Sequence, residues 1–86
     1  MSYEVELSYP RLVGVITKFI DESTLILDES VPLPRRAALL YKWSWILHGL
    51  GYDKPLDHTD LSDEEIKREA ARMLKWIAHI LRESKR

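Results

Sequence analysis

The sequence predicts an α+β fold, in which a small three-stranded antiparallel meander over residues 1–30 precedes a two-helix antiparallel hairpin. Apolar and polar residues alternate near the N-terminus, as in a half-buried strand. β-branched residues dominate the segment after Pro10, and helix start and stop signals bracket two later segments, 33–51 and 62–84. At 86 residues the chain is expected to be a single domain over residues 1–86.

The first strand is predicted from the period-two alternation at the start of the chain. Apolar side chains would face one side of the sheet and polar side chains the other: Tyr3, Val5, Leu7 and Tyr9 against Glu4, Glu6 and Ser8. Pro10 ends the strand, because proline lacks the amide donor that a continuing central strand needs.

The segment 11–20 is predicted to be the second strand, although a helix is the alternative. Gly14 weakens a helix, and Asp21 and Glu22 are unfavourable at a helix C-terminus. The segment also contains four β-branched residues, which favour a strand: Val13, Val15, Ile16 and Thr17. After a turn at residues 21–23, the sequence TLILDE is predicted to be the third strand.

The alternative is a mainly α protein with residues 10–21 as an additional helix. Pro10 suits the first position of a helix. Apolar residues at helical spacing would form its buried stripe: Leu12, Ile16, Phe19 and Ile20.

The segment 33–51 is predicted to be a helix that is apolar on nearly all sides. Pro34 suits its first turn, and Gly49 and Gly51 supply its end. At about 100° per residue, Trp43 and Trp45 point in nearly opposite directions. The larger apolar face contains these residues: Leu39, Leu40, Trp43, Ile46, Leu47 and Leu50.

The segment 62–84 is predicted to be an amphipathic helix that begins with a capping box. Ser62 and Glu65 have the spacing at which each side chain accepts a hydrogen bond from the other's backbone amide. Its apolar side would pack antiparallel against the helix at 33–51, with the meander across both. The main apolar positions are Ile66, Ala70, Met73, Leu74, Ile77 and Leu81.

The composition excludes several classes of protein. The chain has no cysteine, which removes disulfides and thiolate chemistry. It also has no Asn or Gln while 31% of its residues are charged, a combination typical of hyperthermophiles that favours an archaeal source. No apolar run approaches the roughly 20 residues of a membrane helix. With acidic residues near the N-terminus, this predicts a cytoplasmic protein without membrane contact.

The smaller apolar face of the helix at 33–51, which we call the aromatic surface, consists of Ala38, Tyr41 and Trp45. If the meander covers these residues, they belong to the core. If it does not, they form a protein interface, and a small domain with surplus apolar surface commonly forms a symmetric homodimer. A small-molecule pocket is a third alternative.

The second candidate site is a line of cations on the solvent side of the helix at 62–84, which we call the basic ridge. Its members follow spacings of four, three, four, three and four residues: Arg68, Arg72, Lys75, His79, Arg82 and Arg86. Such a line can bind phosphates of a nucleic acid. The alternative is a solvated, salt-bridged face in which Glu64 pairs with Arg68 and His79 with Glu83. The net charge of the chain is −1, but residues 1–30 carry −4 and residues 61–86 carry +2.

A run of potential ligands around one loop does not match a metal site. The run consists of His48, Asp53, Asp57, His58 and Asp60. It lacks the paired histidines of a zinc protease and the central glycine of a calcium loop. The sequence also lacks a glycine-rich phosphate loop and a nucleophile elbow. We therefore expect no metal, no cofactor, no catalytic residue and no enzymatic activity.

These observations predict a small non-enzymatic interaction or assembly protein that acts as a homodimer or as a subunit of a larger complex. The alternative function is a nucleic-acid-binding module that uses the basic ridge. The segment LVGVITKFIDESTLILDES resembles the core hairpin of Sm-like proteins over a short span. The helices that follow do not fit that family, so the sequence assigns no family.

Overall fold

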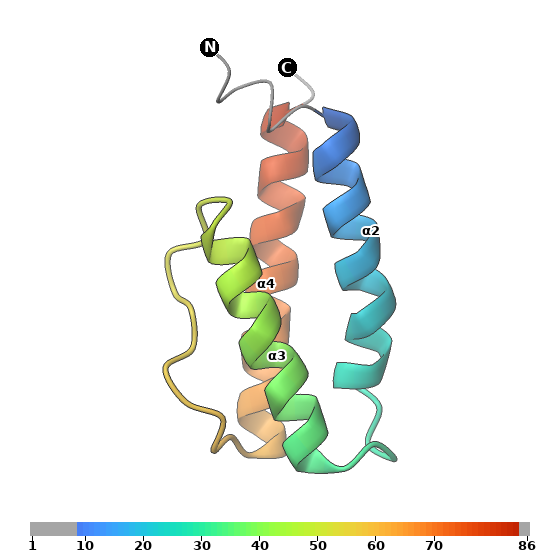
Figure 1. The fold of residues 1–86 in the computed structure, drawn as a ribbon, viewed down its shortest axis with the longest axis vertical. Coiled ribbons are helices and arrows are strands. Elements are labelled where there is room, and N and C mark those ends of the chain that lie inside the picture. Colours follow the sequence, from blue (N-terminus) through green and yellow to red (C-terminus); the bar gives the residue numbers. More distant parts are fainter. Residues whose placement is uncertain (1–8, 85–86) are drawn as a thin grey trace.

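The computed structural model describes residues 9–84, which form three helices and contain no strand (Figure 1). The helices are α2 (Tyr9–Ile26), α3 (Leu33–His48) and α4 (Asp63–Ser84). The α+β prediction with a three-stranded meander is therefore wrong. The second predicted strand and half of the third lie inside α2, while the first predicted strand lies almost entirely outside the described residues.

Helix α2 is the additional helix of the mainly α alternative, and it continues beyond residue 21 to Ile26. Its buried residues recur every three or four positions, as on one side of a helix: Leu12, Ile16, Phe19, Ser23 and Ile26. A β-branched residue lowers helix stability by only about 0.5 kcal/mol. Burying one large apolar side chain contributes about 2 kcal/mol, so packing of this stripe outweighs local propensity.

Substitution of Gly14 by alanine tests whether this segment forms a helix or a strand. A Cβ at Gly14 would have no neighbour within 4 Å, and among the described glycines only Gly51 has a positive φ. We therefore expect Gly14→Ala to stabilise the protein by about 1 kcal/mol, since alanine is the better helix former. Gly51→Ala, at φ 116°, is expected to destabilise it by a similar amount. Urea denaturation of both variants checks the opposite signs, and a destabilising Gly14→Ala would contradict a helix here.

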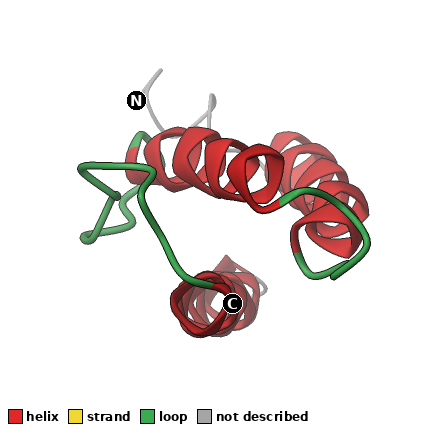
Figure 2. Cartoon of the chain, turned by 90° about the horizontal axis from the view of Figure 1, so that it is seen from below, coloured by secondary structure: helices red, strands yellow, loops and turns green. Residues whose placement is uncertain are grey.

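Helices α3 and α4 run in the same direction, and α2 runs antiparallel to both (Figures 1 and 2). The predicted antiparallel hairpin of the last two helices is therefore wrong. The short link from Ile26 to Leu33 makes α2 and α3 antiparallel neighbours. Residues 49–62, the crossover loop, can instead return along α3, whose 16 residues span about 24 Å.

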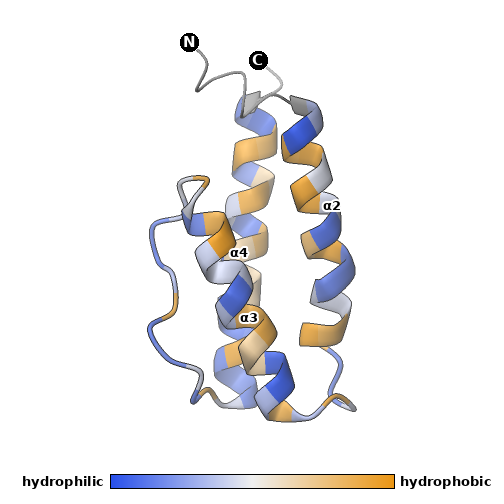
Figure 3. Cartoon of the chain, viewed as in Figure 1, coloured by the Kyte–Doolittle hydropathy of each residue, from blue (hydrophilic) through white to orange (hydrophobic). Residues whose placement is uncertain are grey.

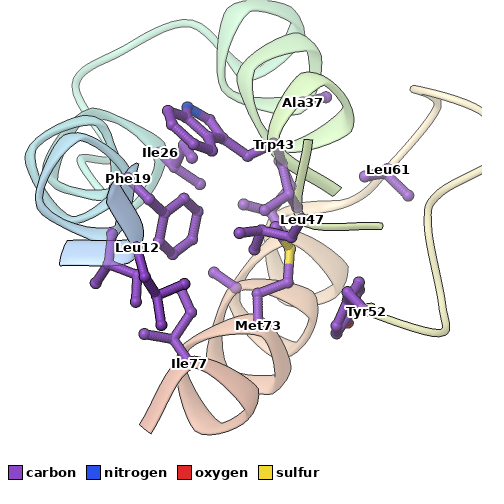
Figure 4. Close-up of a cluster of buried hydrophobic side chains, with 14 residues drawn as sticks. Leu12, Phe19, Ile26, Ala37, Trp43, Leu47, Tyr52, Leu61, Met73 and Ile77 are labelled. Carbon is purple, nitrogen blue, oxygen red and sulfur yellow. The ribbon is translucent and has the colours of Figure 1, made fainter. Parts of the chain in front are cut away.

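The core lies between the three helices and is closed by two residues of the crossover loop (Figure 4). Hydrophobic and hydrophilic bands alternate along the helices, while the crossover loop is mostly hydrophilic (Figure 3). The buried apolar residues are Leu12, Ile16, Phe19, Ile26, Ala37, Leu40, Trp43, Leu47, Tyr52, Leu61, Ile66, Ala70, Met73 and Ile77.

Trp43 joins α3 to α2 through a packing contact and a hydrogen bond. Its ring lies edge-on to Phe19 with centroids 5.3 Å apart. Its Nε1 donates to Glu22 Oε1 at 2.7 Å, and Lys42 Nζ donates to the same oxygen at 3.0 Å. The Trp43 and Lys42 hydrogen bonds hold the pKa of Glu22 below its usual value. This side of α3 is consequently fixed against α2.

The predicted signals at the helix ends are confirmed in part, because α3 ends at His48 rather than at residue 51 and Gly49 has a φ of −63°. Ser62 N donates to Glu65 Oε1 at 2.8 Å, and Glu65 N donates to Ser62 Oγ at 3.1 Å, which confirms the capping box. Gly51, just beyond α3, has a φ of 116°, a conformation that suits glycine.

Arg36 joins the ends of all three helices. Only 3% of its surface is exposed, and its Nε donates to the Ile26 carbonyl oxygen at the end of α2 at 2.7 Å. Its Nη2 donates to Asp63 Oδ1 in the first turn of α4 at 2.6 Å. Hydrogen bonds from Arg36 and Lys67 hold the pKa of Asp63 below its usual value. The contact with Asp63 places the start of α3 beside the start of α4, in keeping with their parallel arrangement.

Candidate functional site

The aromatic surface lies on the side of α3 that turns away from the core. Ala38 is exposed, Tyr41 is half-buried, and 45% of the Trp45 surface is exposed. The Trp45 ring lies 6.5 Å from the Tyr41 ring and 5.4 Å from the His48 ring, measured between centroids. The structure therefore brings the three predicted residues together on one side of the helix and leaves nearly half of the Trp45 surface open to solvent.

The crossover loop, rather than a meander, covers one edge of the aromatic surface. Trp45 Nε1 donates to the Leu56 carbonyl oxygen at 2.8 Å, and Leu56 N donates to Ser44 Oγ at 2.9 Å. These bonds hold the indole in one orientation and occupy its hydrogen-bonding atom. What Trp45 presents to solvent is therefore mainly the carbon surface of a fixed ring.

The crossover loop is itself anchored at its first residues. Tyr52 is buried, and its ring lies edge-on to Trp76 of α4 with centroids 5.5 Å apart. His48 Nδ1 donates to the Tyr52 carbonyl oxygen at 2.6 Å, because a carbonyl can only accept. The crossover loop is therefore held against α3 by the hydrogen bond from His48 and against α4 by the ring contact with Trp76.

The basic ridge lies along the exposed side of α4. Arg68, Arg72, Lys75, His79 and Arg82 are all exposed, and Arg86 lies outside the described residues. Within residues 9–84, Arg72 is the one member with an ion pair, to Glu69 at 3.5 Å. The predicted pairs of Glu64 with Arg68 and of His79 with Glu83 are not among the ion pairs of this part of the chain.

The loop residues considered as metal ligands do not converge. Within the described part of the chain, no group of three or more His, Cys, Asp or Glu side chains is placed to hold a metal ion. His58 Nδ1 lies 2.6 Å from Asp57 Oδ1, and both side chains are exposed. Their hydrogen bond lowers the pKa of Asp57 and raises that of His58.

A small pocket lies beside the first turn of α3. Its volume is about 160 Å³, well below the roughly 300 Å³ at which ligand sites in proteins begin. One ionisable residue contributes to its wall. The lining residues are Leu33, Pro34, Thr59, Asp60 and Leu61. This arrangement offers no pair of groups for acid–base chemistry.

Two residues of structural importance were not singled out from the sequence. Arg36 precedes Leu40 by four positions and Trp43 by seven, so its place on the buried side of the helix could have been found from spacing. Leu56 carries no such signal, because its backbone rather than its side chain holds Trp45.

The chain matches no known family model, no curated protein and no solved structure. Within residues 9–84, none of the helices combines the length and the apolarity that crossing a lipid bilayer requires.

Proposed function

We propose that this protein is a small, non-enzymatic assembly protein in the cytoplasm of a thermophilic cell, and that its aromatic surface binds a second copy of the chain. Closed two-fold homodimers are the commonest assemblies of soluble proteins, which makes a second copy the first partner to test. A different subunit of a larger complex is the alternative partner for the same surface.

The observation that carries this proposal is the exposed but immobilised indole of Trp45. Tryptophan and tyrosine are enriched among the residues that contribute most to protein–protein binding. The hydrogen bond to Leu56 and the ring contacts to Tyr41 and His48 already fix the side chain. A partner would therefore gain contact area without the entropic cost of ordering a mobile side chain.

We expect Trp45→Asp to weaken self-association by at least about 30-fold, the loss typical of removing a central interface residue. The physical reason is that a partner would have to bury a carboxylate where the indole made apolar contact. Sedimentation or light scattering across micromolar to millimolar protein gives the mass, which should be twice that of one chain for the native sequence and should fall for the variant.

The matched control is Ile20→Asp, because Ile20 of α2 is 48% exposed and undergoes the same chemical change on another helix. It should leave the association unchanged. Circular dichroism must show that both variants remain helical. A single-chain mass for the native protein at every concentration would contradict the homodimer, and equal weakening by both variants would contradict the aromatic surface as the interface.

A further inference from the structure

The basic ridge presents its charges at nearly regular intervals along one line. Its described members are separated by four, three, four and three residues. At a rise of 1.5 Å per residue, neighbouring cations lie about 4.5–6 Å apart along the axis, and the whole line extends about 21 Å. The described members are Arg68, Arg72, Lys75, His79 and Arg82.

Two of the carboxylates at the start of α4 make contacts away from the basic ridge. Asp63 binds Arg36 at 2.6 Å and Lys67 at 3.1 Å. Glu65 accepts the hydrogen bond from the Ser62 amide at 2.8 Å. The same contacts that begin the helix and join it to α3 therefore withhold negative charge from the ridge.

Among the residues that the structure describes, most charged members of the ridge have no ion pair. Glu69 lies 3.5 Å from Arg72, the upper part of the range for an ion pair. Within residues 9–84, Arg68, Lys75 and Arg82 have no carboxylate within 4.0 Å. Exposed charges that are not neutralised internally are free to replace the counterions of a polyanion.

The apolar side of α4 argues against a lipid surface as the polyanion. A helix that lies on a membrane inserts its apolar side between the headgroups. In α4 that side is already buried in the core, where it consists of Ile66, Ala70, Met73 and Ile77. A nucleic acid needs no free apolar side, because its charge lies in a backbone of evenly spaced phosphates.

We propose that the basic ridge binds the phosphate backbone of a nucleic acid strand without preference for base sequence. The phosphates of one strand are evenly spaced, as the residues of the basic ridge are, so that one line of cations follows one strand. This binding is a separate activity from the association through the aromatic surface, which lies on α3.

Fluorescence anisotropy with labelled, mixed-sequence single-stranded and duplex DNA tests the proposal. The four charged contacts of Arg68, Arg72, Lys75 and Arg82 predict a log–log salt slope of about −3 on single strands, so affinity should fall roughly 50-fold between about 50 and 200 mM salt. The double variant Arg68→Gln, Lys75→Gln should reduce the magnitude of the single-strand slope by about 0.7 for each lost contact. Glutamine supports a helix as well as the native residues do, which keeps the fold intact.

The matched control is Arg11→Gln, Lys18→Gln, which removes the same charge from exposed positions of α2. It should leave affinity and salt slope nearly unchanged. Absence of binding to both DNA forms at about 50 mM salt, where such binding is strong, would overturn the proposal. So would equal loss in the two double variants, or binding to vesicles of anionic lipid without binding to DNA.

Discussion

Trp43→Ala is expected to lower the free energy of unfolding by about 4 kcal/mol, the usual loss for truncating a buried tryptophan. Only 3% of the Trp43 surface is exposed. The substitution leaves a cavity beside Phe19 and removes the hydrogen bond to Glu22, which is 2.7 Å long. Urea denaturation followed by circular dichroism measures this loss, provided that the slope with denaturant stays constant.

Trp45→Ala is the matched control, because it makes the same chemical change two residues along the same helix. It removes one exposed hydrogen bond, to the Leu56 carbonyl, and the packing of a ring that is 45% exposed, so the expected loss is about 2 kcal/mol, half of that at Trp43. The measurement belongs at the lowest usable protein concentration, where association contributes least. Similar losses at the two positions would contradict the orientation of α3.

Arg36→Ala is expected to lower the free energy of unfolding by about 3 kcal/mol. The change removes a guanidinium that is 97% buried and leaves the Ile26 carbonyl without its donor. It also separates Asp63 from its nearest partner, so that the start of α4 loses its link to α3. For a domain of this size the loss corresponds to a decrease in Tm of roughly 12–24 °C.

Arg35→Ala is the control for this position. Arg35 is the preceding residue of α3 and is exposed, and substitutions at such sites usually change stability by less than about 0.5 kcal/mol. Thermal unfolding of the two variants side by side checks the difference. A Tm for Arg36→Ala within a few degrees of that for Arg35→Ala would show that the three-helix junction contributes little.

The start of α4 and the role of Gly51 beyond α3 could be predicted because their signals are local. Ser62 and Glu65 are three residues apart, and the bonds between them form within one turn. Gly51 tolerates a positive φ regardless of what the rest of the chain does. The opposite orientations of Trp43 and Trp45 also follow from helix geometry alone.

The secondary structure of α2 could not be predicted from propensity, because its local and tertiary preferences conflict. The β-branched residues after Gly14 favour a strand, while the spacing of Leu12, Ile16 and Phe19 fits a helix. Which preference prevails depends on whether α3 and α4 offer a surface on which that stripe can be buried. Such a surface exists only once the helices have assembled.

The sequence predicted where the two candidate sites lie but not the ion pairs of the basic ridge. Their residues and the side of the helix on which they lie follow from spacing, and the structure places Trp45 and the basic ridge in solvent accordingly. The pairing of the ridge did not follow from spacing. The predicted pair of Glu64 with Arg68 is not among the ion pairs of residues 9–84, whereas Asp63 binds Arg36, a contact between residues 27 positions apart in sequence.

Local sequence therefore decided where α3 and α4 begin and that Trp45 and the basic ridge are turned outward, because those properties depend on neighbours within one or two turns. Tertiary structure decided that residues 9–26 are a helix, that α3 and α4 are parallel, and that the crossover loop covers one edge of the aromatic surface. These features depend on contacts between residues far apart in sequence, whose energies exceed the small local preferences of the chain.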